Sequence, residues 1–229
     1  MKAKEFIEVW EEFAKTIVQD GDNVGTLWYQ DAGWTRRVTG EANASEKESP
    51  LGDKLVEHLP QGIWRYRTEE WKLDLVLAKK QNWPTPKDWK EGEWQSKWDK
   101  IFWPTTYEII VEHETSGGIS WQEMVKLIHL RSRLKVLITY TYDVGSSEKS
   151  QKKSQDLIDE TRNQFQAMLK AAWKNFPENW DTEYLLIVGQ LDERGDTPEV
   201  KWHYTTFAPW GEKVCEHPST EANIKKCNQ

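Results

Sequence analysis

Cysteine is scarce in this sequence of 229 residues, which contains only Cys215 and Cys227. Two cysteines are too few for a framework of disulfides, so we expect the protein to work in a reducing compartment, the cytoplasm. Together with His217, the two thiols could in principle bind zinc, but their spacing matches no standard pair of zinc-ligand clips. The sequence therefore gives little support to a zinc site.

Long apolar runs and an excess of positive charge are lacking as well. Apolar runs such as residues 184–188 are far shorter than the roughly 20 residues that cross a membrane. The first residues mix acids with apolar side chains, and we expect no signal-peptide core there. Acidic side chains outnumber basic ones, 38 against 31, which gives a net charge of -7. This balance argues against a protein whose whole surface binds nucleic acid, although it allows a local basic strip.

Several nucleotide and hydrolase motifs are also absent. The sequence contains no GxxxxGKS/T phosphate loop, no GxGxxG after an expected strand, no GxSxG elbow and no HExxH zinc motif. Nucleotide-driven enzymes and serine hydrolases are therefore poor candidates for its function.

Aromatic residues, in contrast, are abundant. Fifteen Trp, seven Tyr and six Phe supply apolar area for a folded core, despite a mean hydropathy of -0.83. We expect a single domain over residues 1–229, because no clear linker interrupts the chain. Five of the tryptophans lie in residues 81–104, a Trp-rich insertion. They either pack a long loop onto the sheet or form a stacking surface for bases or sugars.

The spacing of apolar residues predicts an α/β (α+β) fold with a central mixed sheet and helices against both faces. Spacings of three and four predict helices, whereas alternation or short apolar runs predict strands. The expected helices cover residues 4–19, 50–59, 120–133 and about 151–176, and the expected strands cover residues 26–29, 34–38, 71–80, 107–114, 134–142, 183–191 and 200–207. The last two strands are expected to pair as a hairpin.

Three acids lie in two neighbouring expected strands. Asp74 is within a leucine-rich strand, and Glu112 and Glu114 close the next one, where the period of two places both on the same face. A carboxylate in an apolar strand is costly unless it is paired or metal-bound. Asp74 beside Glu112 would supply hard oxygen ligands for Mg²⁺ or Mn²⁺. The alternative is that these acids lie at solvated strand ends or pair with basic side chains, among them Lys79, Arg131 and Arg133.

Residues 71–80 and 107–140 resemble the core of the PD-(D/E)XK nuclease superfamily, the restriction-endonuclease-like fold, which runs helix, three strands, helix, strand. The resemblance covers residues 1–142 and is strongest from 70 to 142. It implies a Mg²⁺-dependent nuclease that hydrolyses DNA with an activated water. Asp74 would be the acid of the second strand and Glu112 the acid of the third-strand motif, with Glu114 among or next to the metal ligands.

The sequence departs from the family pattern at one position. The third motif of the family has lysine two residues after the acid, where this chain has Glu114, and a carboxylate does not replace a cation. Lys126 on the following helix is the candidate for this cation, and the alternative is an ordinary ion pair with Glu123. His113 alternates away from Glu112, which favours packing or hydrogen bonding over a role as a base.

Two further expectations concern the first helix and the nucleic acid. Family members often add an acid from the first helix, for which Glu12 is the candidate metal ligand and Glu8 and Glu11 are alternatives. Residues 121–135 are locally basic and are the expected phosphate-facing strip, unless they form an ordinary solvated helix face. Family analogy also allows a homodimer.

Two functional hypotheses follow from these residues. The first is a metal-dependent DNA nuclease whose catalytic residues are Asp74, Glu112, Glu114 and Lys126. The second is a nuclease-like scaffold that has lost catalysis and acts through protein–protein contacts, which the missing in-strand lysine and the acidic balance favour. A saccharide-binding module, which rests on the aromatic residues alone, is a third and weaker alternative.

Overall fold

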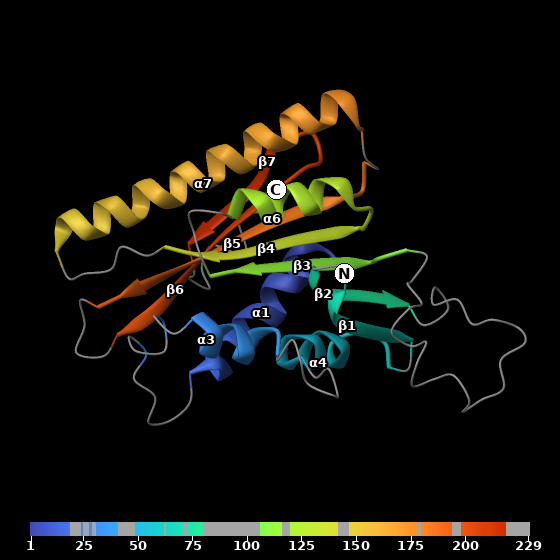
Figure 1. Cartoon of the computed structure of the whole chain (residues 1–229), viewed down its shortest axis with the longest axis horizontal. Coiled ribbons are helices and arrows are strands. Elements are labelled where there is room, and N and C mark those ends of the chain that lie inside the picture. Colours follow the sequence, from blue (N-terminus) through green and yellow to red (C-terminus); the bar gives the residue numbers. More distant parts are fainter. Residues whose placement is uncertain are drawn as a thin grey trace, which may run out of the picture.

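The computed structural model describes residues 1–18, 24, 28, 31–40, 49–61, 63–70, 73–79, 106–115, 120–141, 147–177, 180–193 and 198–218. In these residues seven strands form one sheet, in which the order in space follows the order along the chain (Figure 1). The strands are β1 (Trp64–Glu70), β2 (Leu73–Lys79), β3 (Ile109–Glu114), β4 (Leu134–Tyr140), β5 (Glu183–Asp192), β6 (Glu199–Phe207) and β7 (Lys213–Pro218). The predicted mixed α/β class is confirmed.

The sheet is parallel at its centre and antiparallel on both sides. β1, β2 and β3 form an antiparallel meander, and β5, β6 and β7 form a second one. The pairs β3–β4 and β4–β5 are parallel, so each needs a crossover connection, and each crossover contains a helix. These helices are α6 (Ser120–His129) and α7 (Glu148–Asn175).

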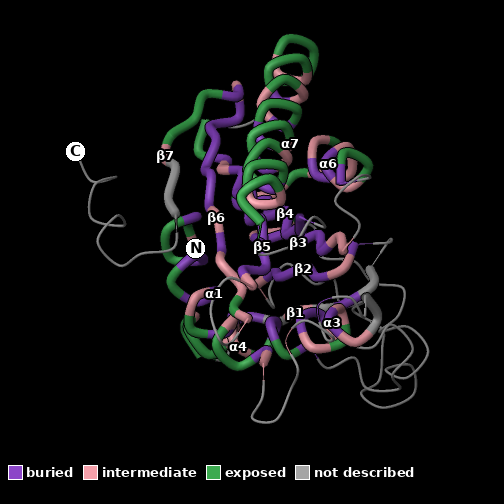
Figure 2. The backbone as a smooth tube through the Cα atoms, turned by 90° about the vertical axis from the view of Figure 1, so that its left-hand side faces the viewer, coloured by how far each residue is buried: buried purple, intermediate pink, exposed green. Residues whose placement is uncertain are grey.

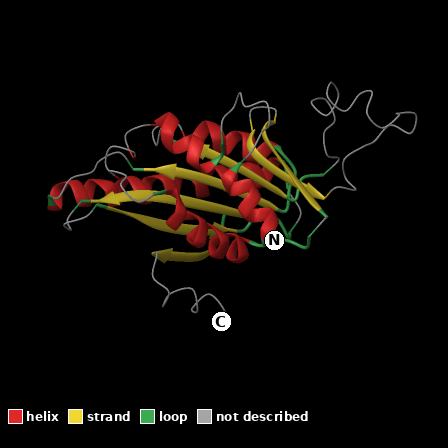
Figure 3. Ribbon diagram, turned by 90° about the horizontal axis from the view of Figure 1, so that it is seen from below, coloured by secondary structure: helices red, strands yellow, loops and turns green. Residues whose placement is uncertain are grey.

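Helices cover both faces of the sheet, as predicted. α1 (Ala3–Ile17), α3 (Asp31–Val38) and α4 (Pro50–Glu57) lie on one face, and α6 and α7 lie on the other (Figures 1 and 3). Alternate side chains of each strand enter two separate cores: Leu75 and Val111 pack on the α1 face, whereas Val76 and Ile110 pack on the α6–α7 face. Buried residues are concentrated along the strands and on the helix faces turned toward them (Figure 2).

Local sequence explains where the helices begin and which side they bury. Phe6, Trp10 and Phe13 recur at spacings of three and four, and all are buried along one stripe of α1. Ser49 is the N-cap of α4, where its side chain accepts a hydrogen bond from the backbone N–H of Gly52, and Pro50 starts the first turn. These features confirm the first two predicted helices.

Some predicted elements are wrong or incomplete. Residues 34–38, predicted as a strand, belong to helix α3, because Trp34 and Val38 are four residues apart and both bury into the α1-face core. In the predicted strand at 26–29 only Trp28 is described, and it is helical. The edge strands β1 and β7 were not predicted, and the helix predicted to residue 133 ends at His129. The Trp-rich insertion at 81–104 lies outside the described residues.

The cysteine and membrane expectations have different outcomes. Cys215 is disulfide-bonded and is not available as a zinc ligand, and Cys227 lies outside the described residues. This disulfide removes the reason for expecting a reducing compartment, so the cytoplasmic location stays a prediction without support from the cysteines. Within the described ranges, no helix has the length and apolar character to span a membrane.

We expect the partly buried His203 to make the stability of the fold dependent on pH. Burial, helped by the charges of Arg162 and Lys201, lowers the pKa of His203 to about 4, and its Nε2–H donates a hydrogen bond of 2.9 Å to Gln190 Oε1. The unfolded chain, with a histidine pKa near 6.5, takes up a proton first as the pH falls, so stability is lost between about pH 6.5 and pH 4. The wild type should lose unfolding free energy between about pH 7.5 and pH 5, and His203→Gln should lose about 1 kcal/mol less. This figure is small because the side chain of His203 is only half-buried and water screens part of the effect.

Urea unfolding of both proteins at the two pH values measures this difference. His129→Gln, at the exposed end of α6, is the control and should follow the wild type. An equally steep acid loss in His203→Gln would show that the ring of His203 does not govern the pH response.

Candidate functional site

The two strand acids Asp74 and Glu112 lie on adjacent strands. β2 and β3 pair Val76 with Ile110 and Leu75 with Val111, and one further step in this register places Asp74 opposite Glu112. Since side chains alternate along a strand, both acids project to the α6–α7 face. The predicted proximity of these two residues is therefore present in the fold.

A backbone contact holds the carboxylate of Asp74. The backbone pairing of β2 with β3 ends at Leu75 and Val111, and beyond it the N–H of His113 donates a hydrogen bond of 2.6 Å to Asp74 Oδ2. The carboxylate thus accepts from a backbone donor of the neighbouring strand, which restricts the orientation of the side chain.

Helix α6 adds a third acid and a cation. Glu123 and Lys126 are three residues apart on this helix, on the side that faces β3. Lys126 Nζ donates to Glu112 Oε2 at 2.8 Å and also forms an ion pair with Glu123. We call Asp74, Glu112, Glu123 and Lys126 the carboxylate–lysine cluster.

Glu112 is the most deeply buried member of the carboxylate–lysine cluster, with 0% of its side chain exposed. Among the described residues, no hydrogen-bond partner reaches its Oε1. Burial raises the pKa of Glu112 to about 10, and a hydrogen bond with Glu123 and the negative charge of Asp74 act in the same direction. The nearby Lys126 acts in the opposite direction without reversing the shift.

Lys126 is only partly shielded from water, with 30% of its side chain exposed. Burial opposes its charge, but its hydrogen bonds with Glu112 and Glu123 outweigh that effect and raise the pKa of the ammonium group. Lys126 is thus shared by two glutamates, and one cation does not keep both carboxyl groups ionised at low cost.

The donor atoms of the carboxylate–lysine cluster are those that a hard divalent cation prefers. Carboxylate oxygens suit Mg²⁺ and Mn²⁺, and the unpaired Glu112 Oε1 is a buried acceptor that a cation would satisfy. In the part of the chain that the structure describes, however, no group of three or more His, Cys, Asp or Glu side chains is arranged to hold a metal as it stands. Lys126 pairs with both glutamates, so cation binding would require its ammonium group to move.

The structure places the two other predicted metal ligands, Glu114 and Glu12, on different faces of the sheet. Glu114 is at the end of β3, half-buried, on the same face as Glu112 and opposite Thr139 of β4. Glu12 is on α1, the helix of the other face, where its carboxylate is 2.7 Å from Lys54 Nζ and 3.2 Å from His58 Nε2. The structure therefore does not bring Glu12 to Asp74 and Glu112.

His113 faces away from the carboxylates, as the alternation along its strand predicts. Its Nε2 lies 2.6 Å from the hydroxyl of Tyr140, and that hydroxyl also accepts a hydrogen bond of 2.6 Å from Trp34 Nε1. An indole N–H can only donate, so Tyr140 accepts from Trp34, while the direction of the contact between Tyr140 and His113 Nε2 depends on the tautomer of the imidazole. Burial lowers the pKa of His113 to about 3, which makes it a neutral structural residue and not a base of the cluster.

The basic strip predicted at residues 121–135 is divided in the fold. Lys126 joins the carboxylate–lysine cluster, whereas Lys135 is fully buried with its Nζ 3.0 Å from the hydroxyl of Tyr184. Arg131 and Arg133 line a cleft of about 660 Å³ where β4 and β5 begin, and Arg133 lies 3.8 Å from the carboxylates of Glu108 and Asp181. The predicted basic residues therefore lie in three separate environments, which are the carboxylate–lysine cluster, the buried core and this cleft.

The sequence interpretation missed Glu123 as a site residue. Residue spacing indicates only an ordinary ion pair between Glu123 and Lys126 on one helix. The pairing of Lys126 with Glu112 depends on how α6 packs on β3, which residue spacing does not specify.

The pairing of Lys126 with two glutamates makes a testable contribution to stability. Lys126→Met should lower the free energy of unfolding by about 1–3 kcal/mol, because it leaves carboxyl groups buried without their cation. Glu112→Gln in the same protein should recover at least half of this loss, since a neutral amide needs no counter-ion. Urea unfolding measures both changes. Lys149→Met, on the exposed first turn of α7, is the control, and an equal loss there would contradict a specific role for Lys126.

Comparison of the chain with protein-family models and with curated proteins finds no match. The case for a function therefore rests on the carboxylate–lysine cluster and on the arrangement of the strands and helix around it.

Proposed function

We propose that the chain is a metal-dependent nuclease that hydrolyses phosphodiester bonds of DNA, built on a restriction-endonuclease-like core. The order of elements supports this assignment: helices precede the antiparallel meander β1–β2–β3, and α6 then crosses over to the parallel strand β4. Asp74 on the second strand and Glu112 on the third occupy the positions that the resemblance assigns to the metal-binding acids.

The observation that carries the proposal is the environment of Glu112. A buried carboxyl group lies next to two further acids, has a single lysine as its cation and keeps one oxygen without a partner among the described residues. Most buried polar groups in proteins have a hydrogen-bond partner, and an acid whose pKa is strongly shifted by burial and by neighbouring charges is a candidate functional group. A divalent cation would supply the missing positive charge.

The residues of the carboxylate–lysine cluster would have different roles in catalysis. Asp74, Glu112 and Glu123 would hold Mg²⁺, which when bound lowers the pKa of water and polarises a phosphate oxygen. The backbone N–H of His113 keeps Asp74 oriented. Lys126, displaced from the glutamates, would donate to a phosphate oxygen or orient the water, the role of the lysine that the chain lacks at position 114.

A second candidate function has its own supporting observation. Lys126 already neutralises part of the acid cluster, as an internal cation does in a purely structural ion-pair network. A nuclease-like scaffold that acts only through protein–protein contacts would keep this arrangement and would not bind a metal.

Metal binding and DNA cleavage separate the two functions. We expect Mn²⁺ to bind to the purified full chain in calorimetry, and Asp74→Asn or Glu112→Gln to abolish the binding. With Mg²⁺ or Mn²⁺, the wild type should cleave plasmid and linear duplex DNA, and Lys126→Met should lower the rate by about 100-fold or more while metal binding persists. Glu12→Gln is the matched control, because this acid pairs with Lys54 on the other face of the sheet.

Two results would contradict the proposal of a nuclease. If Mn²⁺ does not bind with or without DNA, and no duplex or single strand is cleaved, the structural ion-pair network is the correct description. Loss of activity in Glu12→Gln equal to that in Asp74→Asn would also contradict the assignment of the site.

A further inference from the structure

The cleft of about 660 Å³ at the start of β4 and β5 is also the place where α6 and α7 end. In Figure 1 both helices end at the edge of the sheet from which these strands start. We call it the arginine cleft and define it by Glu108, His129, Arg131, Arg133, Phe176 and Asp181. His129 is one turn after Lys126, about 5 Å along the axis of α6, so this helix connects the cleft to the carboxylate–lysine cluster.

The arginine cleft contains an open positive charge, whereas its acids are paired. Arg133 Nε lies 3.8 Å from a carboxylate oxygen of Glu108 and 3.8 Å from one of Asp181. Glu108 is also 3.7 Å from Lys79 Nζ. Arg131 is exposed and pairs with no acid among the described residues. Its guanidinium group is therefore available to a phosphate, to which arginine donates two hydrogen bonds at once.

Exposed aromatic rings lie along the rim of the arginine cleft. Phe176, the C-cap residue of α7, is 69% exposed, and its ring centroid is 6.5 Å from that of His129. Trp180, four residues further along the chain, is 74% exposed. The rings of Trp173 and Trp210 contact it at 5.5 and 5.0 Å and hold it at the surface. A group of exposed rings, unlike a single exposed residue, marks an interaction site.

Two lysines of α7 extend the positive charge toward the tryptophans. Lys170 and Lys174 are exposed and are one turn apart on the same side of the helix, with Trp173 between them in the sequence. Within the part of the chain that the structure describes, neither lysine forms an ion pair. Cations that alternate with aromatic rings are typical of surfaces that bind a single nucleic-acid strand, because phosphates pair with the cations and bases stack on the rings.

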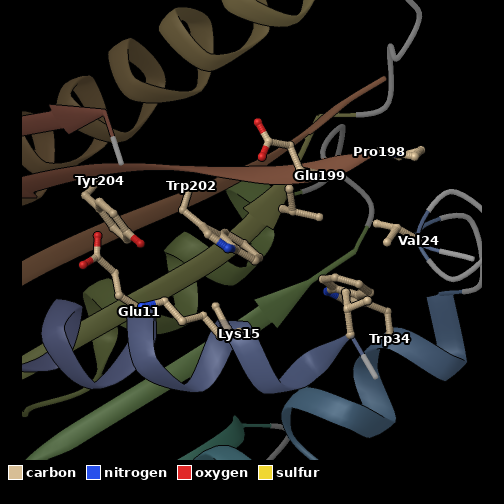
Figure 4. Close-up of a pocket in the computed structure, with 11 residues that line it drawn as sticks. Glu11, Lys15, Val24, Trp34, Pro198, Glu199, Trp202 and Tyr204 are labelled. Atoms are coloured by element: carbon tan, nitrogen blue, oxygen red, sulfur yellow. The ribbon is translucent and has the colours of Figure 1, made fainter. Parts of the chain in front are cut away.

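The cavity on the opposite face of the sheet offers less to a ligand (Figure 4). It has a volume of about 490 Å³ and lies between α1 and β6. Trp34 and Trp202 in its wall are buried members of the α1-face core, and Glu199 forms an ion pair with Lys201. Exposed rings and an open cation therefore favour the arginine cleft as a binding site.

We propose that the arginine cleft and the aromatic rings beside it bind a single strand of DNA. Arg131 pairs with a phosphate, and successive bases stack on Phe176 and Trp180. Bases within a duplex cannot do so without leaving their own stack. The inference rests on the proposed nuclease for its choice of DNA and names a single-stranded stretch as the substrate. From Glu108 to Glu112 the chain extends about 13 Å, a distance that a few nucleotides span.

Fluorescence anisotropy with a labelled oligo(dT) of about 12 nucleotides measures this binding. The full chain is used in EDTA, so that neither a metal nor cleavage contributes. At about 50 mM salt we expect a Kd of about 10 μM or lower, and binding of a duplex of the same length that is weaker by about 5-fold or more. Phe176→Ala and Trp180→Ala should each weaken single-strand binding by about 5-fold or more. Arg131→Gln should reduce the slope of log K against log salt by about 0.7.

Trp121→Ala and Lys149→Met are the matched controls, an exposed tryptophan of α6 and an exposed lysine at the other end of α7, and both should bind as the wild type does. Circular dichroism verifies that each variant is folded. The proposal is overturned if the single strand does not bind, if the duplex binds as tightly, or if the three cleft variants bind as the wild type does.

Cleavage with Mg²⁺ separates this proposal from that of the nuclease. Metal-dependent cleavage together with unchanged single-strand binding in the three cleft variants contradicts the arginine cleft alone. Single-strand binding that the cleft variants weaken, without any cleavage by the wild type, supports the cleft and contradicts the nuclease. Asp74→Asn should abolish cleavage and leave single-strand binding in EDTA unchanged.

Discussion

The burial of the Glu112 carboxyl group is the constraint on which the arrangement of the site depends. An acid inside an apolar sheet costs several kcal/mol unless a cation or a proton compensates it. Lys126 can provide that compensation only because α6 lies against β3, and Met124 and Leu127 of α6 are buried in the same core as Val76. The packing of α6 against the sheet therefore determines whether the ammonium group of Lys126 reaches the carboxyl group of Glu112.

His113 connects the two faces of the sheet. Its N–H holds Asp74 on the α6–α7 face, and its Nε2 is hydrogen-bonded with the hydroxyl of Tyr140 on the α1 face, where that hydroxyl accepts from Trp34. These three contacts, each of 2.6 Å, run from helix α3 through the sheet to an acid of the cluster. A backbone donor cannot rotate as a side chain can, so the orientation of Asp74 depends on the position of β3 itself.

The central elements could be predicted from the sequence because their periodicity is strong. One type of secondary structure is indicated at each of these elements, by the apolar run of β4, by the alternation in β2 and β3 and by the apolar stripe of α7. Because β2 and β3 are adjacent, Asp74 then lies near Glu112. β1, with the sequence WRYRTEE, is a polar edge strand with little pattern to detect. The pairing of Lys126 with Glu112 depends on how a helix is placed over a strand, and no spacing within one chain segment encodes that placement.

The unpaired polar atoms of the described residues bear on whether the carboxylate–lysine cluster is merely structural. A buried polar atom without a hydrogen-bond partner lowers the stability of the fold. Here Glu112 Oε1 has no partner, and on the next strand the buried hydroxyl of Thr139, opposite Glu114, has none either among the residues described. Both atoms belong to side chains that project to the face covered by α6. Unpaired buried atoms also occur away from the cluster, at Trp10 Nε1 and Trp64 Nε1, so the open Oε1 of Glu112 supports the proposed cation only together with the acids beside it.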